Sequence, residues 1–189
     1  RDLRQGDPSE AQVDVGAMTF PDQLETIEQH VQDAIDNGAE VLVGGERAEI
    51  GDGDFFEPTV LVDVDPSMAI MREETFGPVL PIMKVPSAAE AIRVANDSQF
   101  GLNASIWSSN KPRARRLARQ VEAGNVCIND VIASYTAVEA PYGGVKDSGL
   151  GRRKGRWEIE EYTEPKTIME DLIGLSSEPF WYPYSEKIV

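Results

Sequence analysis

Two carboxylates stand beside an aromatic ring in residues 73–78, Glu-Glu-Thr-Phe-Gly-Pro, just before an apolar run typical of a strand. A turn at this place presents its side chains at the edge of a sheet. There a carboxylate such as Glu74 can accept two hydroxyl hydrogen bonds from a ribose, and the ring of Phe76 can pack on a flat heterocycle. The same spacing also fits a plain turn with a solvated pair of glutamates, and spacing alone favours this simpler interpretation.

Two other segments have the composition of cleft walls. Residues 124–129, Gly-Asn-Val-Cys-Ile-Asn, form a short apolar run after a glycine, and residues 141–152 are rich in glycine. Both indicate strand-and-loop pieces that can line a site. The Gly-Leu-Gly step at residues 149–151 does not predict a phosphate loop, because it follows a loop and its glycine spacing does not fit.

The ordinary candidates for nucleophile and base are few. His30, the single histidine, lies in the middle of a predicted helix, and we expect it to be solvent-exposed and not a general base. Cys127, the single cysteine, lies between Val126 and Ile128 in a predicted strand, where a buried thiol is usually inert. One cysteine excludes an internal disulfide and a zinc cluster of cysteines, and we expect no metal site.

The composition is that of a globular chain with an acidic surface. The 189 residues are 41% hydrophobic and 27% charged, which is enough for one real core. The net charge of −15 argues against nucleic acids and anionic membranes as partners. A basic stretch at residues 111–119 fits the solvated face of a helix. With no long apolar run and no leader-like start, we expect a cytoplasmic protein.

Helical and strand patterns alternate along the chain. The spacing of apolar residues predicts helices, and short runs rich in valine, leucine and isoleucine predict strands. Helices are expected at residues 21–37, from 87 onward and at 111–122, with strands at 40–43, 58–64, 79–85, 102–107 and 125–129. This alternation predicts an α/β fold with an open, mainly parallel sheet covered by helices.

The C-terminal part of the chain has a different pattern. Residues 130–151 contain too many proline and glycine breakers for a regular element, and a last helix is expected at 157–162. Residues 163–168, Thr-Glu-Pro-Lys-Thr-Ile, predict an extended edge strand that needs a partner. Residues 176–189 are aromatic enough that we expect them to pack on a surface.

The order of these motifs resembles the aldehyde dehydrogenase superfamily over residues 1 to about 168. The segments that carry the resemblance are Glu-Glu-Thr-Phe-Gly-Pro-Val at 73–79, Asn-Asp-Ser-Gln-Phe-Gly-Leu at 96–102, residues 124–129, Pro-Tyr-Gly-Gly-Val-Lys-Asp-Ser-Gly at 141–149 and Glu-Tyr-Thr-Glu-Pro-Lys-Thr-Ile at 161–168. The chain resembles the C-terminal half of such an enzyme. We therefore expect residues 1–162 to be part of the catalytic domain, 163–175 an oligomerisation strand and 176–189 an aromatic tail.

The resemblance implies the oxidation of an aldehyde to a carboxylic acid with NAD or NADP. In that family a thiolate attacks the carbonyl to give a thiohemiacetal, a hydride leaves to the nicotinamide, and water hydrolyses the resulting thioester. By motif matching, Glu74 would bind the nicotinamide ribose, Phe76 would pack near the nicotinamide, and Gln23 would be a weaker cofactor contact. Asn129 and Tyr142 would border the aldehyde tunnel. Residues 163–168 would join copies of the chain in a homo-oligomer.

The chain also departs from the family pattern. The nucleophilic cysteine, the Glu-Leu-Gly-Gly base and the dinucleotide-binding domain lie before the part of the family that this sequence resembles. We therefore expect the chain to be inactive alone, with no catalytic residue of its own, and Cys127 does not replace the missing thiol. The alternative is a non-catalytic module for oligomerisation or partner binding. Residues 133–141 weakly resemble bacterial semialdehyde dehydrogenases, and the choice between NAD and NADP stays open.

Overall fold

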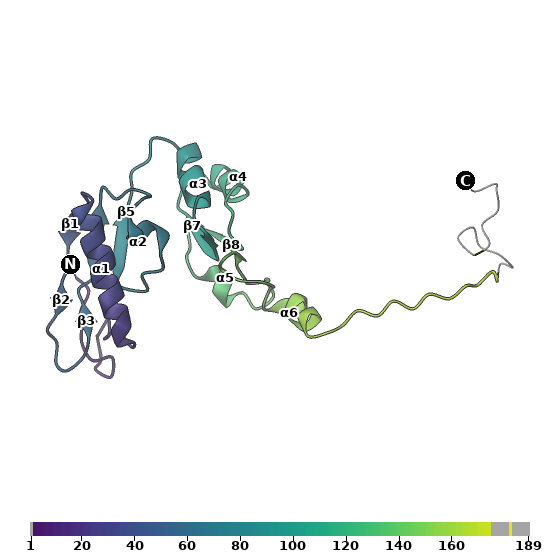
Figure 1. Cartoon of the computed structure of the whole chain (residues 1–189), viewed down its shortest axis with the longest axis horizontal. Helices are drawn as coiled ribbons and strands as arrows, with labels where there is room; N and C mark the ends of the chain where they lie inside the picture. Colours follow the sequence, from purple (N-terminus) through teal and green to yellow (C-terminus); the bar gives the residue numbers. More distant parts are fainter. Residues whose placement is uncertain (1, 175–181, 183–189) are drawn as a thin grey trace.

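Helices and short strands alternate throughout the computed structural model, which describes residues 2–174 and 182. Its elements are α1 (Pro21–Asp36), β1 (Glu40–Val43), β2 (Arg47–Ala48), β3 (Phe55–Phe56), β4 (Thr59–Val62), α2 (Ala69–Arg72), β5 (Val79–Ile82), α3 (Ala88–Asn96), β6 (Phe100–Gly101), β7 (Asn103–Ile106), α4 (Lys111–Ala118), β8 (Asn125–Ile128), α5 (Ala133–Thr136), β9 (Val145–Lys146) and α6 (Gly155–Glu161). Figure 1 shows one group of elements around α1 and β5 and another around α3 and β8. We call residues 2–85 the first region and residues 86–174 the second region. The predicted α/β class is confirmed.

Helix α1 forms where the spacing of its apolar residues predicts it. Leu24, Ile27, Val31 and Ala34 are each at most 2% exposed, and they recur every three or four residues along one face. Pro21 occupies the first turn, where its missing N–H has no helical partner to lose. The helix ends before Gly38, which has φ +102°, a conformation that glycine adopts without strain.

Strands β1, β4 and β5 form a mixed three-stranded sheet in the first region. The segment between β1 and β4 contains no helix to carry the chain back across the sheet, and these two strands pair antiparallel. Helix α2 lies between β4 and β5, which pair in parallel. Strands β2 and β3 make a separate antiparallel pair between β1 and β4, where the sequence predicted no strand. The sheets of the chain are therefore small and mixed in strand direction.

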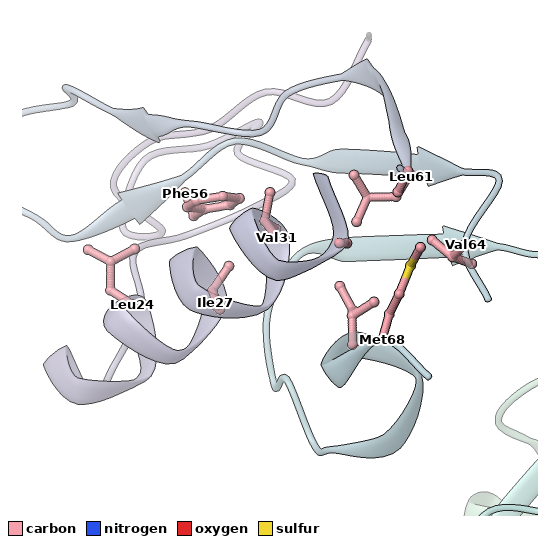
Figure 2. Close-up of a cluster of buried hydrophobic side chains, with 10 residues drawn as sticks. Leu24, Ile27, Val31, Phe56, Leu61, Val64 and Met68 are labelled. Carbon is pink, nitrogen blue, oxygen red and sulfur yellow. The ribbon is translucent and has the colours of Figure 1, made fainter. Parts of the chain in front are cut away.

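The hydrophobic core lies between α1, α2 and the strands of the first region. Figure 2 shows side chains of α1 facing Phe56, Leu61, Val64 and Met68, which come from β3, β4 and the segment leading to α2. Phe56 is 1% exposed and Leu61 is fully buried. Burying a side chain of this size away from water stabilises the folded state by about 1.5–3 kcal/mol. Burial of this face holds α1 against the sheet.

The second region contains two small strand pairs and short helices. Strands β7 and β8 pair in parallel, and β6 and β9 pair antiparallel. Helix α3 begins where the sequence predicts a helix, and Ser87 caps it: its hydroxyl accepts a hydrogen bond from the N–H of Glu90 at 3.1 Å. At the start of β8 the chain approaches another glycine segment so closely that a Cβ at Gly124 would lie 1.7 Å from the carbonyl oxygen of Gly143. A side chain therefore has no room at Gly124.

The C-terminal segments agree in part with the prediction. The segment at 130–151, predicted to be irregular, contains α5 and β9, and α6 covers most of the predicted last helix. Residues 163–174 run away from α6 as an extended segment, which pairs with no strand in the described chain (Figure 1). The predicted aromatic tail at 176–189 lies outside the described residues except for Tyr182. Among the described residues, no helix is both long and apolar enough to cross a membrane.

Candidate functional site

The loop that follows α2 presents the predicted cofactor residues to solvent. Glu74 is exposed, and its carboxylate has no hydrogen bond or ion pair with any described residue. The ring of Phe76 is 70% exposed. Phe76 has φ +47°, a left-handed conformation that is uncommon for a bulky residue. Because exposure of a large ring and an unusual backbone conformation both cost free energy, their coincidence in one loop marks a candidate binding site.

Helix α1 and strand β4 hold this loop in place. The side-chain amide of Gln23 donates a hydrogen bond to the carbonyl oxygen of Thr75. The loop also packs closely on the helix, because a Cβ at Gly77 would lie 2.4 Å from Cδ1 of Ile27. Beyond it, the N–H of Thr59 in β4 donates to the carbonyl oxygen of Pro78 at 2.8 Å. Gln23, the weakest of the predicted cofactor residues, therefore lies against the same loop as Glu74 and Phe76.

The prediction that His30 is exposed is wrong. His30 is 5% exposed, its Nδ1 lies 3.0 Å from the hydroxyl of Thr75, and its Nε2 lies 3.4 Å from a carboxylate oxygen of Glu73. The helical repeat gives the reason, because a residue three positions after Ile27 lies on the same face of α1. The loop at 73–77 folds over this position and covers the ring. A role as a general base finds no new support in these contacts.

Asn129, a predicted substrate residue, is exposed at the end of β8. Its side chain is hydrogen-bonded to the backbone of Ser108, accepting from the N–H at 2.7 Å and donating to the carbonyl oxygen at 3.0 Å. The residue has φ +56°, which asparagine tolerates better than most side chains. Asn129 therefore joins the ends of β7 and β8.

Tyr142, the other predicted substrate residue, is half-buried and has a well-defined ring environment. Its ring meets that of Tyr135 edge to face, with centroids 5.6 Å apart, and the ammonium of Lys154 lies 5.0 Å from its centroid. The ammonium of Lys154 also donates to the carbonyl oxygen of Tyr135. Tyr142 lines a hollow of about 250 Å³ together with Arg152 and other residues of the glycine-rich segment. The aromatic pair and the cation keep this wall in one arrangement.

These residues form two separate sets in the described chain. Gln23, Glu74 and Phe76 lie in the first region, and Asn129 and Tyr142 lie in the second, with no hydrogen bond or ring contact joining the sets among the described residues. Cys127, expected to be buried, is 6% exposed in β8. In residues 2–174 and 182, no three side chains of His, Cys, Asp or Glu gather as metal ligands.

Comparison with known proteins decides what kind of chain carries these two sets. The model of the Aldehyde dehydrogenase family matches residues 1–168. The chain belongs to the aldehyde dehydrogenase family. Over 172 residues it is 44% identical to a 4,4'-diapolycopene aldehyde oxidase of Methylomonas sp, covering 91% of this chain and 32% of the relative. Over 157 residues it is 45% identical to a putative succinate-semialdehyde dehydrogenase [NADP(+)] of Mycolicibacterium smegmatis, covering 82% and 30%.

Solved structures agree with this membership. The aldehyde dehydrogenase of Mycobacterium tuberculosis complexed with NAD+ superposes with a TM-score of 0.85 at 34% identity, covering 93% of this chain and 36% of that one. An NAD-dependent aldehyde dehydrogenase from Sinorhizobium meliloti gives 0.83 at 41% identity, covering 93% and 34%. This aldehyde dehydrogenase chain therefore spans about a third of the length of its relatives.

Sequence reasoning missed two contributors to the candidate site of this aldehyde dehydrogenase chain. The position of His30 in the helix, three residues after Ile27, indicates burial. The prediction of exposure followed the polar character of the side chain instead. Lys154 gave no comparable signal. Its contacts with Tyr135 and Tyr142 join residues that are apart in sequence, and its φ of +71° depends on the surrounding fold.

Proposed function

We propose that this chain is the C-terminal part of an NAD(P)-dependent aldehyde dehydrogenase that oxidises an aldehyde to a carboxylic acid. The observation that carries the proposal is the loop at 73–77, where Glu74 and Phe76 are exposed on a segment anchored to α1. Membership of the family supports the reaction type. The same fold brings Asn129 and Tyr142 as walls for the aldehyde.

The residues of the loop fit a dinucleotide. An ionised carboxylate accepts hydrogen bonds from two neighbouring hydroxyls, and that of Glu74 is not engaged by any described residue. The exposed ring of Phe76 offers a flat apolar surface beside it. We assign ribose binding to Glu74, packing near the nicotinamide to Phe76, and a secondary contact to Gln23. When bound, NAD(P) supplies the acceptor for the hydride that leaves the substrate.

The covalent chemistry requires a thiolate that reaches the aldehyde carbonyl. Cys127 does not fit this role, because it is 6% exposed and its sulfur lies 4.0 Å from the side-chain oxygen of Asn103 inside the β7–β8 pair. The proposal therefore assigns the thiol and the general base to residues outside these 189, and we expect no turnover by this chain alone. The contribution of the chain is to bind the cofactor and to line the aldehyde site.

The extended segment at 163–168 is proposed to pair with a strand of another copy in a homo-oligomer. It has no ladder partner among the described residues. Apart from the N–H of Thr163, which donates to the carbonyl oxygen of Glu160, and the missing N–H of Pro165, its backbone groups can pair with an added strand. The end of this segment and the residues after it expose large apolar side chains, among them Ile168 at 85% and Met169 at 90%. We take residues 1–162 as the catalytic part, 163–175 as this strand and 176–189 as a tail, in a cytoplasmic enzyme.

The test is the variant Glu74→Gln in the full-length protein that contains this chain. Losing charge-assisted hydrogen bonds to the ribose should lower the rate of hydride transfer, or raise the Kd of NAD(P), by roughly tenfold or more. The matched control is Glu49→Gln, since Glu49 is an exposed glutamate of the first region outside the loop. Equal rates of hydride transfer and equal Kd values for NAD(P) in wild type and Glu74→Gln would remove the role given to Glu74.

The same protein tests the reaction itself. We expect the full-length protein to reduce NAD or NADP in the presence of an aldehyde. The purified 189-residue chain should reduce neither cofactor. A full-length protein that assembles but oxidises no aldehyde would favour the non-catalytic module instead. Turnover by the 189-residue chain alone would contradict the assignment of the thiol to other residues.

A further inference from the structure

The loop at 73–77 must keep an uncommon conformation while two of its side chains stay in solvent. Phe76 has φ +47° and is 70% exposed, so its own ring gains little from burial that would hold the backbone. A segment of this kind moves unless the surrounding structure fixes it. The contacts that fix it come from one face of α1.

His30 supplies the polar part of that face. Its ring is 5% exposed and lies between two side chains of the loop, the hydroxyl of Thr75 at 3.0 Å from Nδ1 and the carboxylate of Glu73 at 3.4 Å from Nε2. Nδ1 is hydrogen-bonded to the hydroxyl of Thr75, with the donor set by the tautomer of the ring, and Nε2 lies within ion-pair distance of the Glu73 carboxylate. Thr75 and Glu73, the two loop residues in contact with the ring, stand on either side of Glu74.

Two further contacts from α1 complete the support. The amide of Gln23, about two turns before His30, donates to the carbonyl oxygen of Thr75. The hydroxyl and the carbonyl oxygen of Thr75 are therefore both bonded to side chains of α1. Gly77 packs against Ile27, where a Cβ would lie 2.4 Å from Cδ1. The helix therefore holds the loop at Glu73, Thr75 and Gly77 and leaves the alternate residues Glu74 and Phe76 pointing elsewhere.

We propose that His30 is a positioning residue that sets the cofactor loop, acting through Thr75 and Glu73 on the placement of Glu74 and Phe76. The proposal rests on the proposed function, since it is the cofactor role of the loop that gives its placement a consequence. His30 itself touches no cofactor and moves no proton in the reaction. Its effect is to preorganise the loop, so that fewer conformations have to be ordered when NAD(P) binds.

The decisive variants are His30→Leu and Thr75→Val in the full-length protein. Each removes the His30–Thr75 hydrogen bond by replacing one polar partner with an apolar side chain of similar volume, and His30→Leu also removes the contact with Glu73. Without this hydrogen bond the free loop samples more conformations, and NAD(P) must order it on binding. The Kd and the KM for NAD(P) should therefore rise by roughly three- to tenfold. The KM for the aldehyde at saturating NAD(P) should stay within twofold of wild type. His30→Asn, whose side-chain amide can still bond to the hydroxyl of Thr75, should recover most of the affinity.

The control for a merely structural effect is Val31→Ala, the next residue of α1, which is 2% exposed in the core. This variant should lower the unfolding temperature and leave the Kd for NAD(P) unchanged. Hydrogen exchange gives a second readout that needs no activity. In His30→Leu and Thr75→Val, the amides of residues 73–77 should exchange faster, while those of α1 exchange at the wild-type rate.

The outcomes separate the two proposals. Wild-type Kd for NAD(P) together with wild-type exchange at 73–77 in both variants overturns the role of His30. A loss of affinity that only follows the fall in unfolding temperature, as measured also for Val31→Ala, overturns it too. If the full-length protein binds no NAD(P) and oxidises no aldehyde, the proposed function fails, and the exchange at residues 73–77 still decides whether His30 holds the loop.

Discussion

The two regions of the chain are stabilised in different ways. In the described residues, every buried hydrophobic side chain except Ala114 and Cys127 belongs to the first region, where α1 and α2 pack on the sheet. The second region has comparable secondary structure but exposes large apolar side chains, including Trp107 at 67% and Val138 at 74%. The difference shows that regular elements alone do not make a core.

The two sets of candidate residues lie in regions that differ in this way. The loop at 73–77, to which we assign cofactor binding, is attached to the region that has its own core, so its anchoring contacts come from within that region. Asn129 and Tyr142 lie in the region whose apolar side chains are not covered by the described chain. Exposed patches of this kind are usually contact surfaces for other polypeptide. We therefore expect Asn129 and Tyr142, the proposed substrate residues, to depend on other parts of the full-length protein more than the loop at 73–77 does.

The largest expected effect comes from removing the same side chain in each region. Phe56→Ala, at a residue 1% exposed, should lower the free energy of unfolding by about 3–5 kcal/mol. Phe100→Ala, at a half-buried residue of β6, should cost about 1 kcal/mol, because less apolar surface is removed from the protein interior. Urea unfolding of both variants measures the difference. Equal losses would show that the second region has a core as tight as that of the first.

Removing the residue at the N-terminus of a helix should have a smaller effect on the free energy of unfolding, and that effect should differ between α1 and the helices of the second region. The N-terminal residue before α1, Phe20, makes no side-chain capping bond, whereas Ser87 caps α3 and Asn110 caps α4 at 3.0 Å from the N–H of Arg113. Ser87→Ala and Asn110→Ala should each cost about 1 kcal/mol, with faster amide exchange in the first turn. Phe20→Ala should change the unfolding free energy by less than about 0.5 kcal/mol. A larger cost at Phe20 would contradict the view that core packing holds α1.

The smallest effect concerns one carboxylate in each region. A hydrogen bond from the guanidinium of Arg4 lowers the pKa of Asp14 to about 2, and the backbone N–H groups of Ala133 and Ile132 lower the pKa of Asp130. Each pKa in the folded state lies below its unfolded value, so the stabilisation is present above about pH 4 and is lost as the pH falls through the folded pKa, near 2 for Asp14.

Salt distinguishes the two cases. Because Arg4 is charged and exposed, salt at roughly 1 M should raise the pKa of Asp14 more than that of Asp130, whose partners are neutral amides. Carboxyl resonances followed during an acid titration at low and high salt measure both shifts. Equal salt responses would mean that the charge of Arg4 contributes little at Asp14.

The sequence predicted the longer elements well. The spacing of apolar residues in α1, the capping serine of α3 and the strand runs of β1 and β8 all depend on residues close together in the chain, and the structure confirms them. The two-residue strands, such as β2 and β9, were not predicted. Each exists only because another segment of the chain lies beside it, and its own residues carry no period to detect.

The sequence by itself determined the family motifs, the apolar face of α1 and the two sets of candidate residues, because these are patterns of residue type and local spacing. Only the tertiary structure decided that His30 is buried and that it meets Thr75, a residue 45 positions away. It also decided how the strands divide into small mixed sheets. Contacts between distant segments depend on how the core closes, and a single sequence records the spacing of its residues but not which surfaces come together.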